Sequence, residues 1–212
     1  MGINPAKLTH TIHDVLLGNA TIQEITVPIA GYKNLFLAPS IIDLASAESA
    51  FAGELGREQL LAEHLADAAP AYDWILIACP PSLTLLTINA LTAATWYLLP
   101  IETESLAVRG AIQLMDTVHR VKRRTNPALK MLGVLPTQYD ARTVLANDVL
   151  ALLRRSYPGM VFAPVPQPVK FKEAVLAGKP MIDYAPDHPG AQAYRDMAEE
   201  VLRRATQTCA TH

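Results

Sequence analysis

Short runs of continuously apolar residues recur along the chain, and longer segments with helical periodicity separate them. The runs lie at residues 35–38, 74–78, 96–99, 131–135 and 160–163. Continuous apolarity, in place of alternation, is typical of strands that are covered on both faces, as in a parallel sheet. We therefore predict a buried, mostly parallel sheet built from these runs.

The intervening segments predict helices that cover both faces of that sheet. They span residues 11–17, 42–51, 57–68, 85–94, 105–124, 142–157 and 189–204. Strands that alternate with helices imply right-handed crossovers and an α/β sandwich of three layers. Because the chain shows no internal repeat, low-complexity tract or linker, the simplest organisation is a single domain over residues 1–212.

The composition excludes several classes of protein. Half of the 212 residues are hydrophobic and 18% are charged, which excludes disordered and collagen-like chains. The formal net charge of −2 hides an asymmetry: residues 1–100 hold 3 Lys and Arg against 9 Asp and Glu, whereas residues 101–212 hold 15 against 11. The second half is therefore where an anionic partner is expected to bind.

Cysteine and histidine usage argues against disulfides and metals. The two cysteines, Cys79 and Cys209, are too few for a disulfide framework and favour a reducing cytoplasm. His10 and His13 share a helix face, but no third ligand lies nearby, so we predict no metal site of protein ligands alone.

One segment is long enough to span a membrane. Residues 74–101 contain no charged residue. The same segment contains Pro80, Pro81, Asn89 and Pro100, so we interpret it as strand, loop, helix and strand in a soluble core, with no membrane contact and no signal peptide expected.

A family resemblance begins within that segment. Residues 72–83, YDWILIACPPSL, resemble the Walker B region of the ParA/Soj partition ATPases, which typically reads IIDCPPSLG after a Tyr-Asp pair. LTINAL follows at residues 86–91, as in the family. Five further segments resemble family motifs in the same order, including TMYDxRT at 138–143 and EAPSxGKPI at 173–181; they lie at 11–17, 37–45, 138–143, 173–184 and 190–201. The resemblance implies a ParA/MinD-like P-loop NTPase fold.

Two departures from the family pattern concern the chemistry. The family begins with a strand, a deviant Walker A loop of the form KGGxGKT and a DxDPQ switch, and the 212 residues contain none of these, so we expect the fold without its first strand and helix. The Walker B aspartate position holds Ala78, followed by Cys79, Pro80 and Pro81. A methyl group cannot orient Mg²⁺. The family implies ATP and Mg²⁺, but we assign no catalytic residue here and expect no ATP hydrolysis.

The resemblance also implies binding residues in the second half of the chain. The nucleotide base would lie between Thr137, Gln138 and Tyr139 on one loop and Pro166 and Gln167 on another, although ordinary turn residues explain these positions equally well. Candidate DNA-binding cations are Arg154, Arg155, Lys170 and Lys172. The cations of residues 120–124 are explained by favourable charge at a helix C-terminus.

The function implied by the resemblance is partitioning of plasmid or chromosome DNA. The expected partners are a ParB-like centromere-binding protein, non-specific DNA, and a second copy or an intact ParA in a dimer. The expected location is the cytoplasm, at the nucleoid if DNA binding is retained. Two alternatives stay open: a truncated record of an active partition ATPase, and a MinD-like positioning or regulatory protein, which the short polar tail at 205–212 disfavours.

Overall fold

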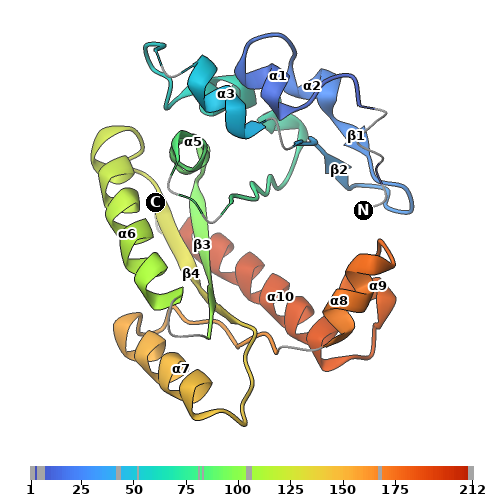
Figure 1. Ribbon diagram of the computed structural model, residues 1–212, viewed down its shortest axis with the longest axis vertical. Helices are drawn as coiled ribbons and strands as arrows, with labels where there is room; N and C mark the ends of the chain where they lie inside the picture. The colour runs from blue at the N-terminus through green and yellow to red at the C-terminus, as the bar shows by residue number, and fades with distance from the viewer. Residues whose placement is uncertain are drawn as a thin grey trace. The chain divides into compact units, whose positions relative to one another are not determined.

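The computed structural model describes residues 3, 8–41, 44–51, 53–80, 82, 84–103, 107–166 and 169–209. Two compact units make up the chain, and each is described by itself (Figure 1). The N-terminal unit holds residues 3–95 and 117–129, and the C-terminal unit holds residues 96–116 and those from 130 onward. The prediction of one domain over residues 1–212 stays a prediction.

Two short helices open the N-terminal unit, and local sequence determines where each begins. Thr11 precedes α1 (Ile12–Leu16), and its backbone N–H donates to Asp14 Oδ2 at 2.8 Å. Thr21 and Glu24 form the same reciprocal capping box at α2 (Ile22–Ile25), also at 2.8 Å. A capping box satisfies backbone N–H groups that a helix start otherwise leaves without acceptors.

The first predicted strand pairs differently from what the apolar run indicates. Strand β2 (Phe36–Leu37) is antiparallel to β1 (Val27–Pro28), with Val27 opposite Leu37. The connection between them is too short for a parallel crossover, and Gly31, with φ of +88°, helps to turn the chain back. The expectation of a buried parallel strand at 35–38 is therefore wrong, and Phe36 is 44% exposed.

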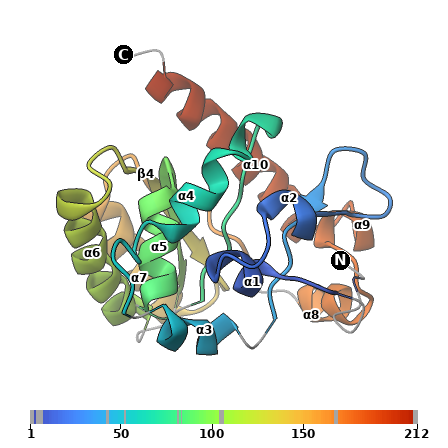
Figure 2. The same ribbon diagram turned by 90° about the horizontal axis from the view of Figure 1, so that it is seen from above.

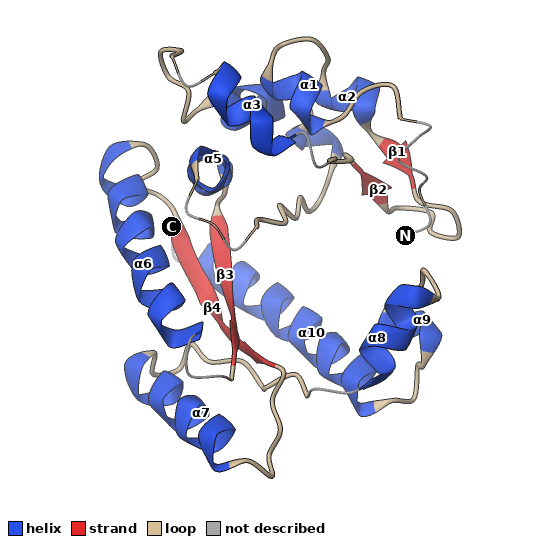
Figure 3. Cartoon of the chain, viewed as in Figure 1, coloured by secondary structure: helices blue, strands red, loops and turns tan. Residues whose placement is uncertain are grey.

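The second predicted strand, residues 74–78, is not a strand in the structure. The segment between η2 (Ala69–Ala71) and α5 (Leu85–Ala93) has no regular secondary structure where it is described (Figure 3). Leu76 is 87% exposed. A parallel strand needs neighbours to accept and donate its backbone hydrogen bonds. Among the described residues no strand pairs with this segment, so the apolar run alone does not make it a strand.

Helices form the core of the N-terminal unit (Figure 2). Its longer helices are α3 (Leu44–Ala50), α4 (Leu60–Ala66), α5 and the last part of α6 (Ala107–Arg124). Buried Leu16, Phe51, Leu61 and Ala90 pack together between α1, α4 and α5. Inside this unit Asn89 is only 1% exposed; its side chain accepts from Leu61 N at 3.1 Å and donates to the carbonyls of Arg57 and Leu85.

The C-terminal unit contains the parallel sheet that the sequence predicts. Strand β3 (Trp96–Glu102) runs parallel to β4 (Lys130–Thr137), with a register shift between Tyr97 and Leu98. Parallel bridges from Val134 to Val161 and from Tyr139 to Pro166 extend the sheet to the fifth apolar run.

Both faces of this sheet are covered. Leu99, Ile101 and Val134 pack with Val149 and Leu153 of α7 (Val144–Ser156), and Leu114 and Met115 of α6 add to this cluster. On the other face Leu132, Leu135, Phe162 and Val165 pack with Ala193, Met197 and Val201 of α10 (Pro189–Cys209). The unit is therefore an α/β sandwich, as the continuous apolarity predicts (Figure 1).

Two helices lie between the sheet and α10 in the sequence and were not predicted. These are α8 (Val169–Leu176) and α9 (Met181–Tyr184), which meet α10 through buried Ala174, Met181 and Ala191. Within the described part of the chain, no helix has both the length and the apolarity that crossing a bilayer requires.

Candidate functional site

The segment that resembles the Walker B region offers no ligand at its key position. Ala78 and Cys79 are both exposed, so Ala78 does not end a buried strand, as the prediction of a strand at residues 74–78 requires. Pro80 is described, whereas Pro81 lies outside the described residues. Position 78 presents a methyl group, which neither coordinates a cation nor accepts a hydrogen bond. In the described part of the chain, no group of three or more His, Cys, Asp or Glu residues gathers where a metal ion could bind.

The loop that follows β4, residues 138–143, begins with a strained residue. Gln138 has φ of +52°, the one positive φ at a non-glycine residue in the described part of the chain. Thr103 Oγ1 donates to the Gln138 carbonyl at 3.2 Å, and Gln138 Nε2 donates to Glu102 Oε1 at 2.5 Å. A left-handed conformation costs a non-glycine residue about 1 kcal/mol or more, so these contacts from the end of β3 hold an unfavourable conformation in place.

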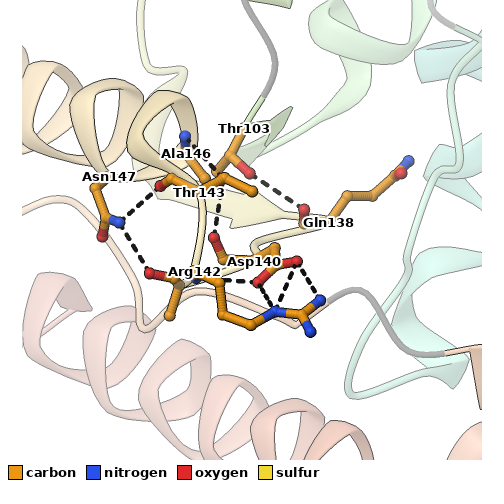
Figure 4. Close-up of polar contacts among 8 residues, drawn as sticks. Thr103, Gln138, Asp140, Arg142, Thr143, Ala146 and Asn147 are labelled. Atoms are coloured by element: carbon orange, nitrogen blue, oxygen red, sulfur yellow. Dashed lines mark hydrogen bonds and ion pairs between the residues drawn. The ribbon is translucent and has the colours of Figure 1, made fainter.

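An ion pair closes the middle of the same loop (Figure 4). Arg142 Nη2 lies 2.7 Å from Asp140 Oδ2, Arg142 Nε lies 2.9 Å from Oδ1, and the backbone N–H of Arg142 also donates to Oδ1 at 3.0 Å. These hydrogen bonds from Arg142 lower the pKa of the Asp140 carboxyl to about 2. Asp140 is therefore a charged, fully engaged carboxylate at neutral pH and does not serve as a proton donor.

Asn147 on α7 fixes the end of the loop. Its Nδ2 donates to the carbonyls of Ala141 at 3.0 Å and Thr143 at 2.7 Å, and its Oδ1 accepts from the Tyr139 hydroxyl at 2.8 Å. Thr143 caps α7 by accepting from Ala146 N at 3.3 Å. Figure 4 shows this loop tied to both β3 and α7, so its shape is determined before any ligand binds.

Two of the predicted base-binding residues lie side by side at an open hollow. Tyr139 N donates to Val165 O at 3.0 Å, which brings Tyr139 next to Pro166. The hollow has a volume of about 1270 Å³, and its lining includes Tyr139, Asp140, Arg142, Pro166, Arg195 and Asp196. Thr137, which is the last residue of β4 and not a loop residue as expected, and Gln138 do not line the hollow, and Gln167 lies outside the described residues.

Sequence reasoning missed the charged residues of this hollow. Asp140 and Arg142 lie within the motif that resembles TMYDxRT, and this motif was the available signal for them. Arg195 and Asp196 come from the first half of α10, and Arg195 Nη1 donates to Pro186 O at 2.8 Å. The hollow is therefore lined by aromatic, proline and charged groups, and acidic and basic side chains come both from the loop after β4 and from α10.

The four predicted DNA-binding cations do not form one patch. Arg154 and Arg155 are exposed in the last turn of α7, whereas Lys170 and Lys172 lie on α8. Helices α7 and α8 lie far apart in both views (Figures 1 and 2). Lys170 Nζ lies 3.1 Å from Glu173 Oε2, and this hydrogen bond raises the pKa of Lys170 while offsetting its charge.

Comparison with known proteins decides the family. An AAA domain family matches residues 1–131. The chain is 38% identical over 202 residues to the sporulation initiation inhibitor protein Soj of Bacillus subtilis, covering 95% of this chain and 79% of Soj. It is 38% identical over 207 residues to the chromosome partitioning protein ParA of Myxococcus xanthus, covering 97% of this chain and 73% of that protein. The chain belongs to the ParA/Soj family.

Other relatives extend the comparison of this ParA/Soj protein. It is 40% identical over 206 residues to an uncharacterised protein of Mycobacterium tuberculosis, covering 96% of this chain but only 64% of that relative's length. Among solved structures, cobyrinic acid a,c-diamide synthase of Mycobacterium smegmatis, with a bound ATP analogue and magnesium, has a TM-score of 0.81 at 37% identity, covering 97% of this chain and 76% of that one.

The fold prediction is confirmed by this likeness. The cell division ATPase MinD of Pyrococcus furiosus has a TM-score of 0.72 at 24% identity over 93% of this chain and 77% of that one. The ParA/MinD-like P-loop NTPase fold is therefore the fold of this chain. The predicted absence of the first strand and helix stays a prediction.

Proposed function

We propose that this ParA/Soj protein acts in the partitioning of chromosome or plasmid DNA, together with a ParB-like partner. The observation that carries the proposal is 38% identity over 207 residues to the chromosome partitioning protein ParA of Myxococcus xanthus, a similarity that runs through both units of the chain. The C-terminal unit contains both the loop after β4, residues 138–143, and the candidate DNA-binding cations. A homodimer, or a dimer with an intact ParA, and a cytoplasmic, nucleoid-associated location form part of the same proposal.

For the nucleotide, we propose base contact without hydrolysis by this 212-residue polypeptide. ATP and Mg²⁺ are the groups that the family implies, and the Mycobacterium smegmatis relative binds an ATP analogue and magnesium. The hollow beside Tyr139 and Pro166 suits a base. Position 78 does not suit Mg²⁺, because Ala78 has no oxygen ligand, and the 212 residues contain no Gly-x₄-Gly-Lys-Ser/Thr pattern to hold phosphates.

Without a metal ligand at position 78 and without a phosphate-binding loop, the charge of the phosphoryl-transfer transition state is poorly stabilised, so we expect much slower ATP hydrolysis by these 212 residues. Phosphoryl transfer depends on positioning and on charge neutralisation by the metal and the phosphate-binding loop. Their loss costs about 4 kcal/mol or more of transition-state stabilisation, which corresponds to roughly a thousandfold in rate. ATP and ADP should bind weakly and about equally, since no lysine of such a loop meets the γ-phosphate.

ATP turnover tests this proposal directly. The purified polypeptide, with duplex DNA and the ParB-like protein of its own replicon, should release phosphate no faster than a protein-free blank. Ala78→Asp should not restore turnover of this polypeptide, because its 212 residues contain no Gly-x₄-Gly-Lys-Ser/Thr loop. Magnesium-dependent turnover clearly above that of the protein-free blank would overturn the proposal and support an active ATPase. Calorimetry should show no strong preference for ATP over ADP.

DNA binding is tested at the two cationic sites separately. We expect weak, sequence-independent binding that falls steeply with salt, because it comes from counterion release. Within the described residues, Arg154, Arg155 and Lys172 form no ion pair, whereas Lys170 does. The double variant Arg154→Ala/Arg155→Ala should make the slope of log affinity against log salt shallower by about 1.8 if both contact phosphates. The double variant Lys170→Ala/Lys172→Ala is the matched comparison. An unchanged slope in both variants would contradict the assignment.

A further inference from the structure

Tyr139 has the only aromatic ring among the described residues that line the hollow beside the loop after β4. Hydrogen bonds hold this residue at both of its ends. Its backbone N–H donates to Val165 O at 3.0 Å, and its side-chain hydroxyl donates to Asn147 Oδ1 at 2.8 Å. A tyrosine that is held only at its backbone can still change its side-chain rotamer, so the bond from the hydroxyl to Asn147 is what restricts the ring.

The side-chain amide of Asn147 is held in one orientation, although the residue is exposed. Its Nδ2 donates to the carbonyl oxygens of Ala141 at 3.0 Å and of Thr143 at 2.7 Å. Because an amide nitrogen has two N–H donors, both are used, and a flipped amide would turn its own oxygen toward those two carbonyl oxygens. The loop itself therefore determines where Asn147 Oδ1 accepts from Tyr139.

A ring that is ordered before binding favours a ligand that stacks on it. Immobilising a mobile side chain on binding costs conformational entropy, and a side chain that is already ordered avoids most of this cost. Nucleobases stack on aromatic side chains, and this contact is available to every base because each has a π face. Restricting the ring of Tyr139 should therefore raise the affinity for a nucleobase by about three- to tenfold.

Asn147 itself is not among the described residues that line the hollow, so it acts on a ligand only through Tyr139. We infer that Asn147 is a positioning residue for the nucleobase, because it holds the ring of Tyr139 in place. This role depends on the base contact proposed above and adds the residue of α7 that controls it. The alternative is that Asn147 only stabilises the loop through its bonds to Ala141 and Thr143.

A double-mutant cycle separates these two roles, with the full chain as the protein and adenosine as the probe. Adenosine affinity is measured by ligand-observed NMR, which detects weak binding. Tyr139→Phe keeps the ring and both loop bonds of Asn147 but removes the hydroxyl, and it should weaken binding about three- to tenfold. Asn147→Ala should weaken binding by a similar factor. The double variant should bind no more weakly than either single variant, because both changes remove the same hydrogen bond.

A matched control and a second nucleoside test the specificity of the effect. Asp148→Ala should leave adenosine affinity unchanged, since Asp148 is exposed next to Asn147 on α7. Each Tyr139 or Asn147 variant should lose affinity for guanosine by the same factor as for adenosine, because a stacking ring does not read the edge of the base. Circular dichroism shows whether Asn147→Ala is folded, and Tyr139→Phe tests the role of the hydroxyl bond with the loop bonds intact.

The outcomes distinguish the role of Asn147 from the base contact on which it depends. If the parent binds adenosine and either single variant binds it equally well, Asn147 does not position the base through Tyr139. The same conclusion follows if the two losses multiply in the double variant, or if they differ between adenosine and guanosine. If the parent does not bind adenosine, the base contact itself is overturned, and the role of Asn147 with it.

Discussion

Substitution of Asn89 should destabilise the N-terminal unit, because this buried side chain satisfies backbone groups from three separate places. Asn89 Oδ1 accepts from Leu61 N, in the first turn of α4, and Nδ2 donates to the Arg57 and Leu85 carbonyls at 2.8 and 3.1 Å. Asn89→Ala removes all three bonds. A buried N–H without an acceptor costs about 1–3 kcal/mol, and each lost donor bond about 1 kcal/mol, so we expect a loss of about 2–4 kcal/mol.

Thermal unfolding followed by circular dichroism measures this effect. For a chain of this length, 1 kcal/mol lowers Tm by about 2–4 °C, so Asn89→Ala should melt roughly 5–15 °C below the parent. Asn89→Asp should melt lower still, because it turns a carboxylate toward two carbonyl oxygens. Gln59→Ala is the control: Gln59 is exposed at the start of α4, makes no capping bond, and should change Tm little. If Asn89→Ala melts within about 1 °C of the parent, the three bonds do not stabilise the fold as argued.

Two further predictions concern the C-terminal unit. The folded-state pKa of Asp140, about 2, lies below its ordinary value, so the stabilisation from this carboxylate should be present above about pH 4 and lost as the pH falls through 2. Arg142→Ala should raise the pKa of Asp140, which an NMR titration of the carboxyl carbon measures. An unchanged pKa would contradict the assigned cause. A Cβ added at Gly133 would collide with the carbonyl oxygen of Met160, so Gly133→Ala should cost about 2 kcal/mol or more in urea unfolding, whereas Gly110→Ala, in open space on α6, should stabilise by about 0.5–1 kcal/mol.

The longer helices and the parallel pair of β3 and β4 could be predicted because periodicity and continuous apolarity are local signals, whereas the short helices α2, α8 and α9 were not predicted. The residues facing each side of β3 and β4 are apolar, and this two-sided burial produces the continuous runs at 96–99 and 131–135. The runs at 35–38 and 74–78 look the same in sequence, but a run cannot show which strand it pairs with. In the structure, the first turns back on β1, and the second pairs with no strand among the described residues.

The sequence predicts where the candidate site lies in the fold, but it does not predict which charged side chains line it. The carboxyl ends of parallel strands meet at one edge, which brings Tyr139 and Pro166 together as expected. The Asp140–Arg142 pair depends on a tight loop held by Gln138 in a left-handed conformation, which no periodicity indicates. Likewise, Arg154–Arg155 and Lys170–Lys172 are close in sequence spacing, but only the structure shows that α7 and α8 place them apart.

Residues that match the resembled motifs have structural roles in this chain, whereas the residues that differ from those motifs lie at exposed positions. Asn89, from LTINAL, joins α4 to α5, and Asp140 with Arg142, from the loop after β4, shapes the hollow; both therefore maintain structure. Ala78 departs where the family places a metal-orienting carboxylate, and Val175 and Leu176 depart on the surface of α8. Variants at Asn89 and Arg142 should therefore change stability or the pKa of Asp140, whereas Ala78, an exposed methyl group, concerns the proposal on turnover alone.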